Sequence, residues 1–205
     1  MHYPLIRPMA AAALTALFLA APAWAALKPG AKAPDFSADA SLAGKDFKFS
    51  LGAALKKGPV VLYFYPSAYT GGCDLEAHTF AAGKPQFDAA GATILGVSAD
   101  DLERLNAFSL DPNYCAGQFP VATDAGGAIA SSFGLDMAPP KSGATDVRGV
   151  KIGHGFIPRT TFVIAADGKI AAVLSSKADS LTPDQHMQKS LAIVLQLRVG
   201  KAKGN

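Results

Sequence analysis

One apolar run does most to limit the folds open to this chain. Residues 60–65 are aliphatic or aromatic, with no polar residue among them, which is typical of a strand buried on both faces of a sheet. Pro66 ends that strand, because proline has no N–H to donate to a sheet ladder. Gly71 and Gly72 then predict a tight loop, and the acidic residues from Asp74 onward predict the start of a helix. The run therefore predicts a strand–loop–helix unit.

Cys73 lies where this loop becomes the helix. The free N–H groups and the dipole at a helix N-terminus stabilise an anion, so they lower the pKa of a thiol placed there. At pH 7 an ordinary thiol is about 3% ionised, whereas a pKa of about 6 makes it roughly 90% ionised. The sequence thus predicts a reactive Cys73. The alternative is an inert cysteine buried in the core, which the flanking glycines and the helix start disfavour.

Length and composition exclude several classes of protein. The 205 residues are enough for one domain with a sizeable core. With 50% hydrophobic and 17% charged residues, the chain is expected to be globular rather than disordered. The formal charge is only +3 and no dense cluster of lysine and arginine is present, so we expect no nucleic-acid partner.

Residues 1–25 have the three-part pattern of a secretory signal peptide. A basic start that includes Arg7 precedes a roughly 13-residue apolar segment at 9–21, and a small-x-small cleavage site ends at Ala25. The apolar segment is shorter than the about 20 residues that span a bilayer as a helix, although an uncleaved anchor is the alternative. We expect cleavage after Ala25, export (to the periplasm in a bacterium), and a mature domain of residues 26–205 that is not bound to the membrane.

The segment that follows the first strand has a specific spacing. Pro66, Thr70 and Cys73 form the pattern Pro-x-x-x-Thr-x-x-Cys, and Glu76 follows three residues later. This resembles the peroxidatic motif of the peroxiredoxins, the thiol-dependent peroxidases of the alkyl hydroperoxide reductase/thiol-specific antioxidant family. Gly71 is a departure, since many members have proline there. That change loosens the loop but removes no chemical group.

Three further segments extend the resemblance. Residues 30–36 match the family's opening Gly-x-x-Ala-Pro-Asp-Phe, and residues 119–124 match its Phe-Pro-x-x-x-Asp segment. Arg159 precedes an apolar strand and an Asp-Gly turn at 167–168, which resembles the late hairpin whose first strand begins with an active-site arginine. The resemblance covers residues 26–199. It implies an α/β, thioredoxin-like fold with a mixed central sheet and helices on both faces.

Hydrophobic periodicity and turn residues predict the other elements. Strands are expected at 46–50, 93–98, within 119–124, and at 158–164 and 170–174; helices are expected at 51–57, 74–89, 101–110, 125–133 and 182–198. The segment at 51–57 has a simple surface connection as its alternative. Gly83 and Pro85 predict a kink or break near Lys84. Residues 135–154 are expected to form a loop or a small hairpin with a strand at 150–152.

The resemblance implies a chemical role for each motif residue. Cys73 would attack the peroxide, and Thr70 would donate its hydroxyl, together with the backbone N–H groups of Gly72 and Cys73. Arg159 would lower the pKa of Cys73 and hold the peroxide, and Pro66 would shield the thiolate from water. On local sequence alone, Thr70 is also compatible with an ordinary turn, Pro66 with a strand end and Arg159 with the start of a surface strand.

The sulfenic acid that peroxide forms on Cys73 must be resolved. Some members use a cysteine five residues later, where this chain has His78. Cys115 is the other cysteine of the chain, and the bacterioferritin-comigratory type places a resolving cysteine near this point, so Cys115 is the preferred candidate. The alternatives are a free buried thiol in a one-cysteine enzyme, or a permanent bridge that would disable Cys73.

The sequence therefore predicts an exported peroxidase for hydrogen peroxide and organic hydroperoxides, monomeric or homodimeric. A thioredoxin-like protein or a small thiol would reduce it, and no cofactor or metal is expected. The alternative is a thioredoxin-fold binding or metal-delivery protein without peroxidase activity, with Cys73 and His154 as ligands. Scattered histidines and the lack of Cys-x-x-x-Cys disfavour that alternative.

Overall fold

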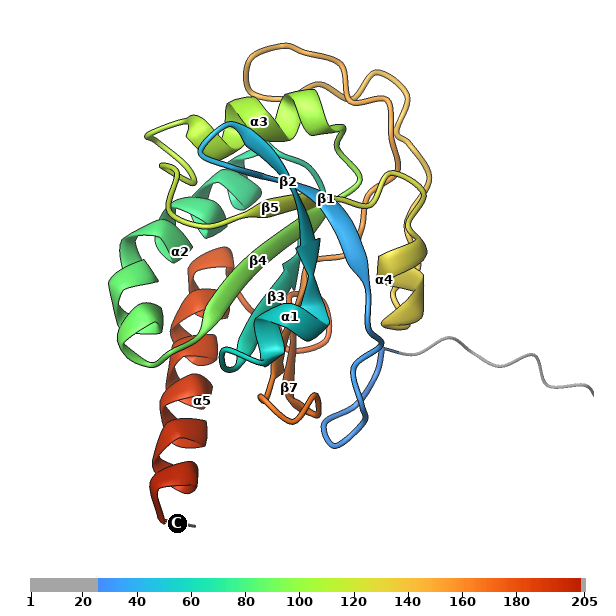
Figure 1. Cartoon of the computed structure of the whole chain (residues 1–205). Helices are drawn as coiled ribbons and strands as arrows, with labels where there is room; N and C mark the ends of the chain where they lie inside the picture. Colours follow the sequence, from blue (N-terminus) through green and yellow to red (C-terminus); the bar gives the residue numbers. More distant parts are fainter. Residues whose placement is uncertain (1–25, 204–205) are drawn as a thin grey trace, which may run out of the picture.

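The computed structural model describes residues 26–203, so the predicted signal peptide lies outside the described residues. Seven strands form one mixed sheet in the order β2-β1-β5-β4-β3-β6-β7 (Figure 1). Their bounds are β1 Ser37–Leu42, β2 Lys45–Ser50, β3 Val60–Phe64, β4 Thr93–Ser98, β5 Val121–Thr123, β6 Thr160–Ile164 and β7 Ile170–Ser175. The pairs β3–β4 and β4–β5 are parallel, and the other neighbouring strands are antiparallel.

Helices cover both faces of this sheet, as predicted. They are α1 Leu51–Leu55, α2 Gly71–Ala89, α3 Leu102–Leu110, α4 Ala128–Ser132 and α5 Pro183–Lys203. Side chains of a strand alternate between faces, so Leu62 and Phe64 of β3 pack in one core with α1 and α4. Tyr63 packs in the other core with α2, α3 and α5, and α2 and α5 lie side by side at the left of Figure 1.

The central strand β3 confirms the prediction made from residues 60–65. All five of its residues are buried, and it is paired on both sides, by β4 and by β6. Tyr65 still donates its N–H to the carbonyl of Val97 at 3.0 Å, and Pro66 then leaves the sheet. The loop that carries the candidate site therefore starts from the most deeply buried strand.

Strand β1 was not predicted from the sequence. Its residues, Ser-Ala-Asp-Ala-Ser-Leu, are small or polar, so they give little of the hydrophobic signal that marks a strand. It joins β2 through a tight turn in which Ala43 and Gly44 have φ of 51° and 73°, as the two-residue turns that suit a right-twisted hairpin require. The prediction of an edge strand at 46–50 is confirmed, because β2 is the last strand on its side.

Helix α2 differs from its prediction in two ways. It begins at Gly71 rather than at Asp74, and it continues without a break past Pro85. Of the predicted kink or break near Lys84, the break is therefore wrong, and α5 packs along this helix. Gly83 permits that packing: a Cβ atom added there would lie 3.0 Å from the sulfur of Met187.

The remaining differences concern short elements. Helix α4 is shorter than the predicted 125–133, because Gly127 before it has a left-handed φ of 70°. The predicted strand at 150–152 is reduced to a single bridge between Thr145 and Lys151. The segment between α4 and β6 forms long loops at the top of Figure 1, and α5 continues to Lys203.

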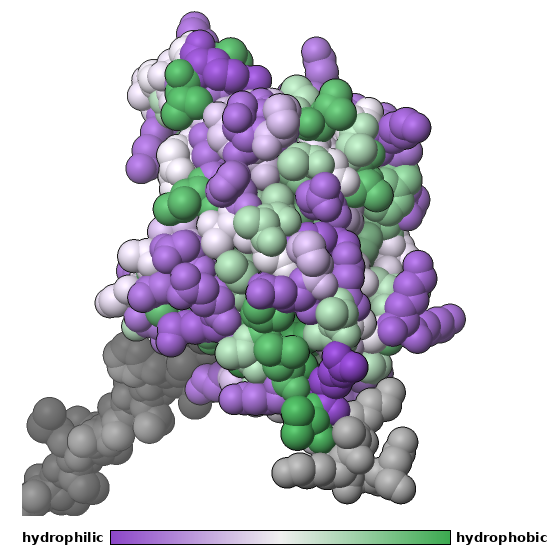
Figure 2. Space-filling model, turned by 90° about the vertical axis from the view of Figure 1, so that its left-hand side faces the viewer, coloured by the Kyte–Doolittle hydropathy of each residue, from purple (hydrophilic) through white to green (hydrophobic). Residues whose placement is uncertain are grey.

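Two surface observations complete the fold. Within residues 26–203, none of the helices combines the length and the apolar character needed to cross a bilayer. Figure 2 shows the side on which α2 and α5 lie, where hydrophilic and hydrophobic residues are interspersed. Leu195 and Val199 of α5 are exposed.

Candidate active site

The candidate nucleophile lies in the first turn of α2, at the end of the 66–70 loop. Cys73 is only 2% exposed, and its N–H donates to the carbonyl of Thr70 at 2.7 Å. Thr70 occupies the N-cap position but its side chain does not cap the helix. Its hydroxyl instead donates to the carbonyl of Ser67 at 2.7 Å.

Arg159 reaches Cys73 from a segment 86 residues away. It directly precedes β6, whose first residue, Thr160, pairs with Phe64 at the end of β3. Its Nη2 donates to the Sγ of Cys73 at 3.2 Å. Gly72 allows this approach, because a Cβ atom there would lie 3.2 Å from the same nitrogen. The antiparallel pairing of β3 and β6 thus brings the arginine and the cysteine together.

The electrostatic environment of Cys73 corrects one prediction. Burial raises the pKa of this thiol from its ordinary value, while the Arg159 guanidinium, the backbone of Ser67 and the hydroxyl of Thr70 lower it. The fall expected from the helix N-terminus is therefore outweighed, because the thiol is almost fully withdrawn from water. The thiolate at this site depends on Arg159, which makes the largest opposing contribution.

The backbone donors also differ from the prediction. The N–H of Cys73 is committed to Thr70, which leaves only Gly72 of the two predicted backbone donors. Within residues 26–203, the Gly72 N–H has no backbone acceptor. Pro66 lines a largely apolar hollow together with Phe156.

A buried ionisable pair lies behind the arginine, and sequence reasoning assigned it no role. Glu76 is fully buried and accepts a hydrogen bond from Nη1 of Arg159. Its other carboxylate oxygen is 3.9 Å from Nδ1 of His186 on α5. His186 contacts the hydroxyls of Thr161 and Ser176 at 2.8 and 2.9 Å. Burial raises the pKa of Glu76 to about 8, against the lowering effect of Arg159.

Acid is expected to destabilise the fold through His186. Burial, and secondarily Arg159, lower its pKa from 6.5 to about 4, so the unfolded chain binds this proton more tightly than the folded one. The stabilisation is complete above pH 6.5 and is lost as the pH falls toward 4, by up to about 3 kcal/mol. Urea unfolding of wild type and His186→Gln from about pH 7 to about pH 4.5 measures it.

The free energy of unfolding of wild type minus that of the variant is expected to fall as the pH drops from about 7 to about 4.5, because glutamine does not ionise. Glu76 contributes a slope of the opposite sign, since its folded pKa is raised. That slope is present in both proteins, so the comparison isolates His186. Equal pH slopes in the two proteins would contradict this origin of the acid sensitivity.

Cys115 lies in the loop between α3 and β5. It is fully buried, and its pKa is raised well above the ordinary value by burial and, to a smaller extent, by Asp111 and Asp74. Both cysteines are free thiols and belong to the same hydrophobic core cluster. The structure thus describes a reduced protein rather than one with a permanent bridge.

The two ligands of the alternative metal hypothesis have separate partners. Nε2 of His154 lies 2.8 Å from a carboxylate oxygen of Asp100, whereas Cys73 contacts Arg159. Among the described residues, no three His, Cys, Asp or Glu side chains are grouped so as to hold a metal ion. This geometry does not favour the metal-delivery hypothesis.

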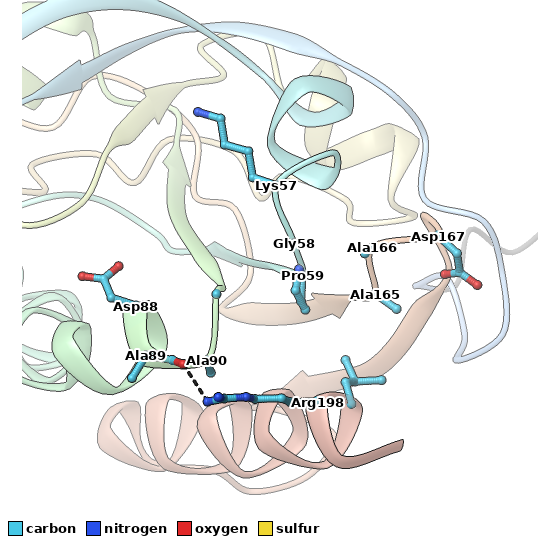
Figure 3. Close-up of a pocket in the computed structure, with 12 residues that line it drawn as sticks. Lys57, Gly58, Pro59, Asp88, Ala89, Ala90, Ala165, Ala166, Asp167 and Arg198 are labelled. Carbon is cyan, nitrogen blue, oxygen red and sulfur yellow. Dashed lines mark hydrogen bonds between the residues drawn. The ribbon is translucent and has the colours of Figure 1, made fainter. Parts of the chain in front are cut away.

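A hollow at the opposite end of the sheet lies away from this chemistry. Residues before β3, at the end of α2, between β6 and β7 and on α5 line it, including Lys57, Asp88 and Arg198 (Figure 3). Nη1 of Arg198 donates to the carbonyl of Ala89 at 2.7 Å. Because β3 runs from this hollow toward Pro66, the length of the strand separates the two sites.

Fold and site together define a class of protein. The site has a buried thiol at a helix start, beside a threonine hydroxyl and a guanidinium, on a thioredoxin-like sheet. These are the groups that a thiol-dependent peroxidase needs. The AhpC/TSA family matches residues 29–173. The chain belongs to this family and is a peroxiredoxin.

Individual relatives agree with this assignment. A peroxiredoxin of Mycobacterium tuberculosis is 33% identical over 150 residues, which cover 73% of this chain and 86% of the relative. The peroxiredoxin Bcp of Xanthomonas campestris is 34% identical over 114 residues, 54% of this chain and 62% of that protein. The crystal structure of peroxidoxin BcpB from Mycobacterium tuberculosis superposes with a TM-score of 0.67 at 30% identity and covers 83% of this chain and 97% of that one.

Proposed function

We propose that Cys73 is the peroxidatic nucleophile of this thiol-dependent peroxidase. Its thiolate attacks the near oxygen of a hydroperoxide, so an S–O bond forms and the O–O bond breaks. Cys73 becomes a sulfenic acid, and the departing oxygen takes up a proton to leave as water or an alcohol. The observation that carries the proposal is the 3.2 Å hydrogen bond from Arg159 to the sulfur.

The neighbouring groups serve this displacement. Arg159 stabilises the thiolate and the charge that develops on the departing oxygen. Thr70 holds the peroxide by turning its hydroxyl from Ser67 toward it, and the N–H of Gly72 is a second donor. Pro66 limits the access of water to the sulfur.

Cys115 is the resolving cysteine in this proposal. Its thiolate attacks the sulfur of the Cys73 sulfenic acid, so that an S–S bond forms, the S–O bond breaks and water leaves. A dithiol reductant then returns two electrons and two protons. Both thiols are buried and unbonded in the reduced fold.

Substrate and reductant follow from the chemistry and from the relatives. Hydrogen peroxide and organic hydroperoxides are the substrates, and a thioredoxin-like protein or a small thiol is the reductant. A related Xanthomonas campestris bacterioferritin comigratory protein was studied for its alkyl peroxide reduction activity; it is 28% identical, with a TM-score of 0.59. The same proposal includes export to the periplasm after cleavage at Ala25. It also includes a monomeric or homodimeric state.

Mass spectrometry tests the cysteine chemistry directly. The reduced protein receives one equivalent of hydrogen peroxide, and free thiols are then blocked. We expect a Cys73–Cys115 disulfide within seconds. If the signal peptide is removed, we also expect the intact mass of a chain that starts at Ala26. A Cys73 sulfenic acid together with a free Cys115 would mean that an external thiol, and not Cys115, resolves Cys73. Two unmodified thiols would overturn the peroxidase assignment.

A further inference from the structure

Asp100 is a buried carboxylate to which the reaction assigns no role. It follows β4, and since β3 and β4 are parallel, both strands end at the same edge of the sheet. Asp100 is fully buried beside the 66–70 loop. Asp101, the next residue, is the one that caps α3.

Asp100 binds the 66–70 loop through both of its oxygens. Oδ1 accepts from the hydroxyl of Ser67 at 2.7 Å, and Oδ2 accepts from the backbone N–H of Ala68 at 2.8 Å. Two adjacent residues of the loop are thus fixed by one carboxylate. A charged acceptor makes both bonds stronger than neutral ones.

Other side chains hold this carboxylate in place. Ser98 donates its hydroxyl to Oδ2 at 2.7 Å, and Nε of Arg104 lies 2.9 Å from Oδ1. His154 approaches Oδ1 at 2.8 Å through Nε2, while its Nδ1 is 2.8 Å from the carbonyl of Gly155. Both ring nitrogens therefore face acceptors, which suits a charged imidazolium. Despite burial, these contacts hold the pKa of Asp100 below its ordinary value.

The fixed residues contact the reacting groups. The carbonyl of Ser67 accepts a hydrogen bond from the hydroxyl of Thr70 at 2.7 Å, and the backbone of Ser67 lowers the pKa of the Cys73 thiol. Tyr69, between these residues, has a φ of 57°. This left-handed conformation is unfavourable for a residue with a side chain, and surrounding contacts must maintain it.

We propose that Asp100 is a positioning residue of the peroxidatic loop, which acts through Ser67 and Ala68 on Thr70 and Cys73. This inference rests on the proposed role of Cys73. Asp100 touches neither thiol nor peroxide. Its effect is to hold Ser67 and, through the Ser67 carbonyl, the Thr70 hydroxyl in place at the start of α2, beside Cys73.

Asp100→Asn tests the proposal in a Cys115→Ala background, which leaves Cys73 as the single thiol. Asparagine keeps the shape, but its NH2 group faces donors and its charge is lost. We expect the rate of the first oxidation by hydrogen peroxide to fall about 10- to 100-fold. We also expect the pH midpoint of that rate, and of thiolate absorbance at 240 nm, to move toward alkaline pH.

Asp124→Asn is the matched control. Asp124 is also a buried aspartate that accepts two backbone N–H groups, from Ile129 and Ala130, but these belong to α4 rather than to the 66–70 loop. A loss of stability alone therefore affects both variants, whereas the alkaline shift is expected only for Asp100→Asn.

Ser67→Ala tests the proposal if Asp100→Asn does not fold. It removes one of the two hydrogen bonds between Asp100 and the loop and leaves Asp100 in place. We expect the rate of Cys73 oxidation to fall about 3- to 10-fold and its pH midpoint to move toward alkaline pH. If Asp100→Asn and Ser67→Ala fold and show the same oxidation rate and pH midpoint as the Asp124→Asn control, the positioning role is overturned. Failure of the Cys115→Ala protein itself to react with peroxide would instead overturn the proposed role of Cys73.

Discussion

Replacing Cys73 with serine is expected to abolish peroxide consumption, whereas replacing Cys115 with alanine is expected to spare the first turnover and stop the following ones. A serine hydroxyl does not ionise near neutral pH and does not attack a peroxide oxygen, so the Cys73→Ser protein should fall to the background rate. In the Cys115→Ala protein, the sulfenic acid forms at the normal rate but has no internal partner. Steady-state turnover with a thioredoxin-like reductant then stops after about one equivalent.

Stopped-flow peroxide consumption with one equivalent, followed by steady-state assay, separates the two effects. Alanine is chosen for Cys115 because this position is fully buried in a hydrophobic cluster, where a serine hydroxyl would lack a partner. Thermal unfolding of both variants controls for loss of fold. Normal steady-state turnover of the Cys115→Ala protein would show that an external thiol resolves Cys73, and normal first turnover of the Cys73→Ser protein would refute the mechanism.

The parts of the fold that local sequence determines were predicted well. The buried strand at 60–65, the Asp-Gly hairpin at 167–168 and the helix that Asp101 caps depend on nearby residues, and each is present. Strand β1 was missed, because its small and polar residues are held in place by β2 and β5 rather than by their own preference. The pairing of Arg159 with Cys73 came only from the family resemblance.

The properties that depend on tertiary packing were not predictable in this way. The expected fall in the pKa of Cys73 considered the helix start and Arg159, but not burial: α2 is covered by α5 and the thiol is withdrawn from water. Asp100 carried no sequence signal of a role at the site, and only the parallel pairing of β3 and β4 brings it to the 66–70 loop. Both cases concern buried polar groups, whose behaviour is set by the partners that the fold supplies.

Arg159→Met is expected to lower the rate of Cys73 oxidation about 10²- to 10³-fold, the range typical for removal of one donor to a developing oxyanion. The guanidinium is the main group that opposes the burial of the Cys73 thiolate, so the pKa of Cys73 is expected to rise and the activity to move toward alkaline pH. Arg159→Lys keeps the charge, but a single ammonium does not replace the forked guanidinium, which hydrogen-bonds to Cys73 and Glu76 at the same time. We therefore expect only partial recovery from lysine.

The same substitution leaves Glu76 buried without its partner, and an unpaired buried charge costs about 3–5 kcal/mol. Because the pKa of Glu76 is about 8 even beside Arg159, this cost applies in alkaline solution, where Glu76 would be ionised. Loss of activity through unfolding must therefore be separated from loss of chemistry. The double variant Arg159→Met/Glu76→Gln removes the ionisable carboxyl, so we expect it to recover stability in urea unfolding at alkaline pH while the oxidation rate stays low. Recovery of the rate together with the stability would mean that Arg159 only supports the fold, because a residue that acts on the thiolate and the departing oxygen is not replaced by neutralising Glu76.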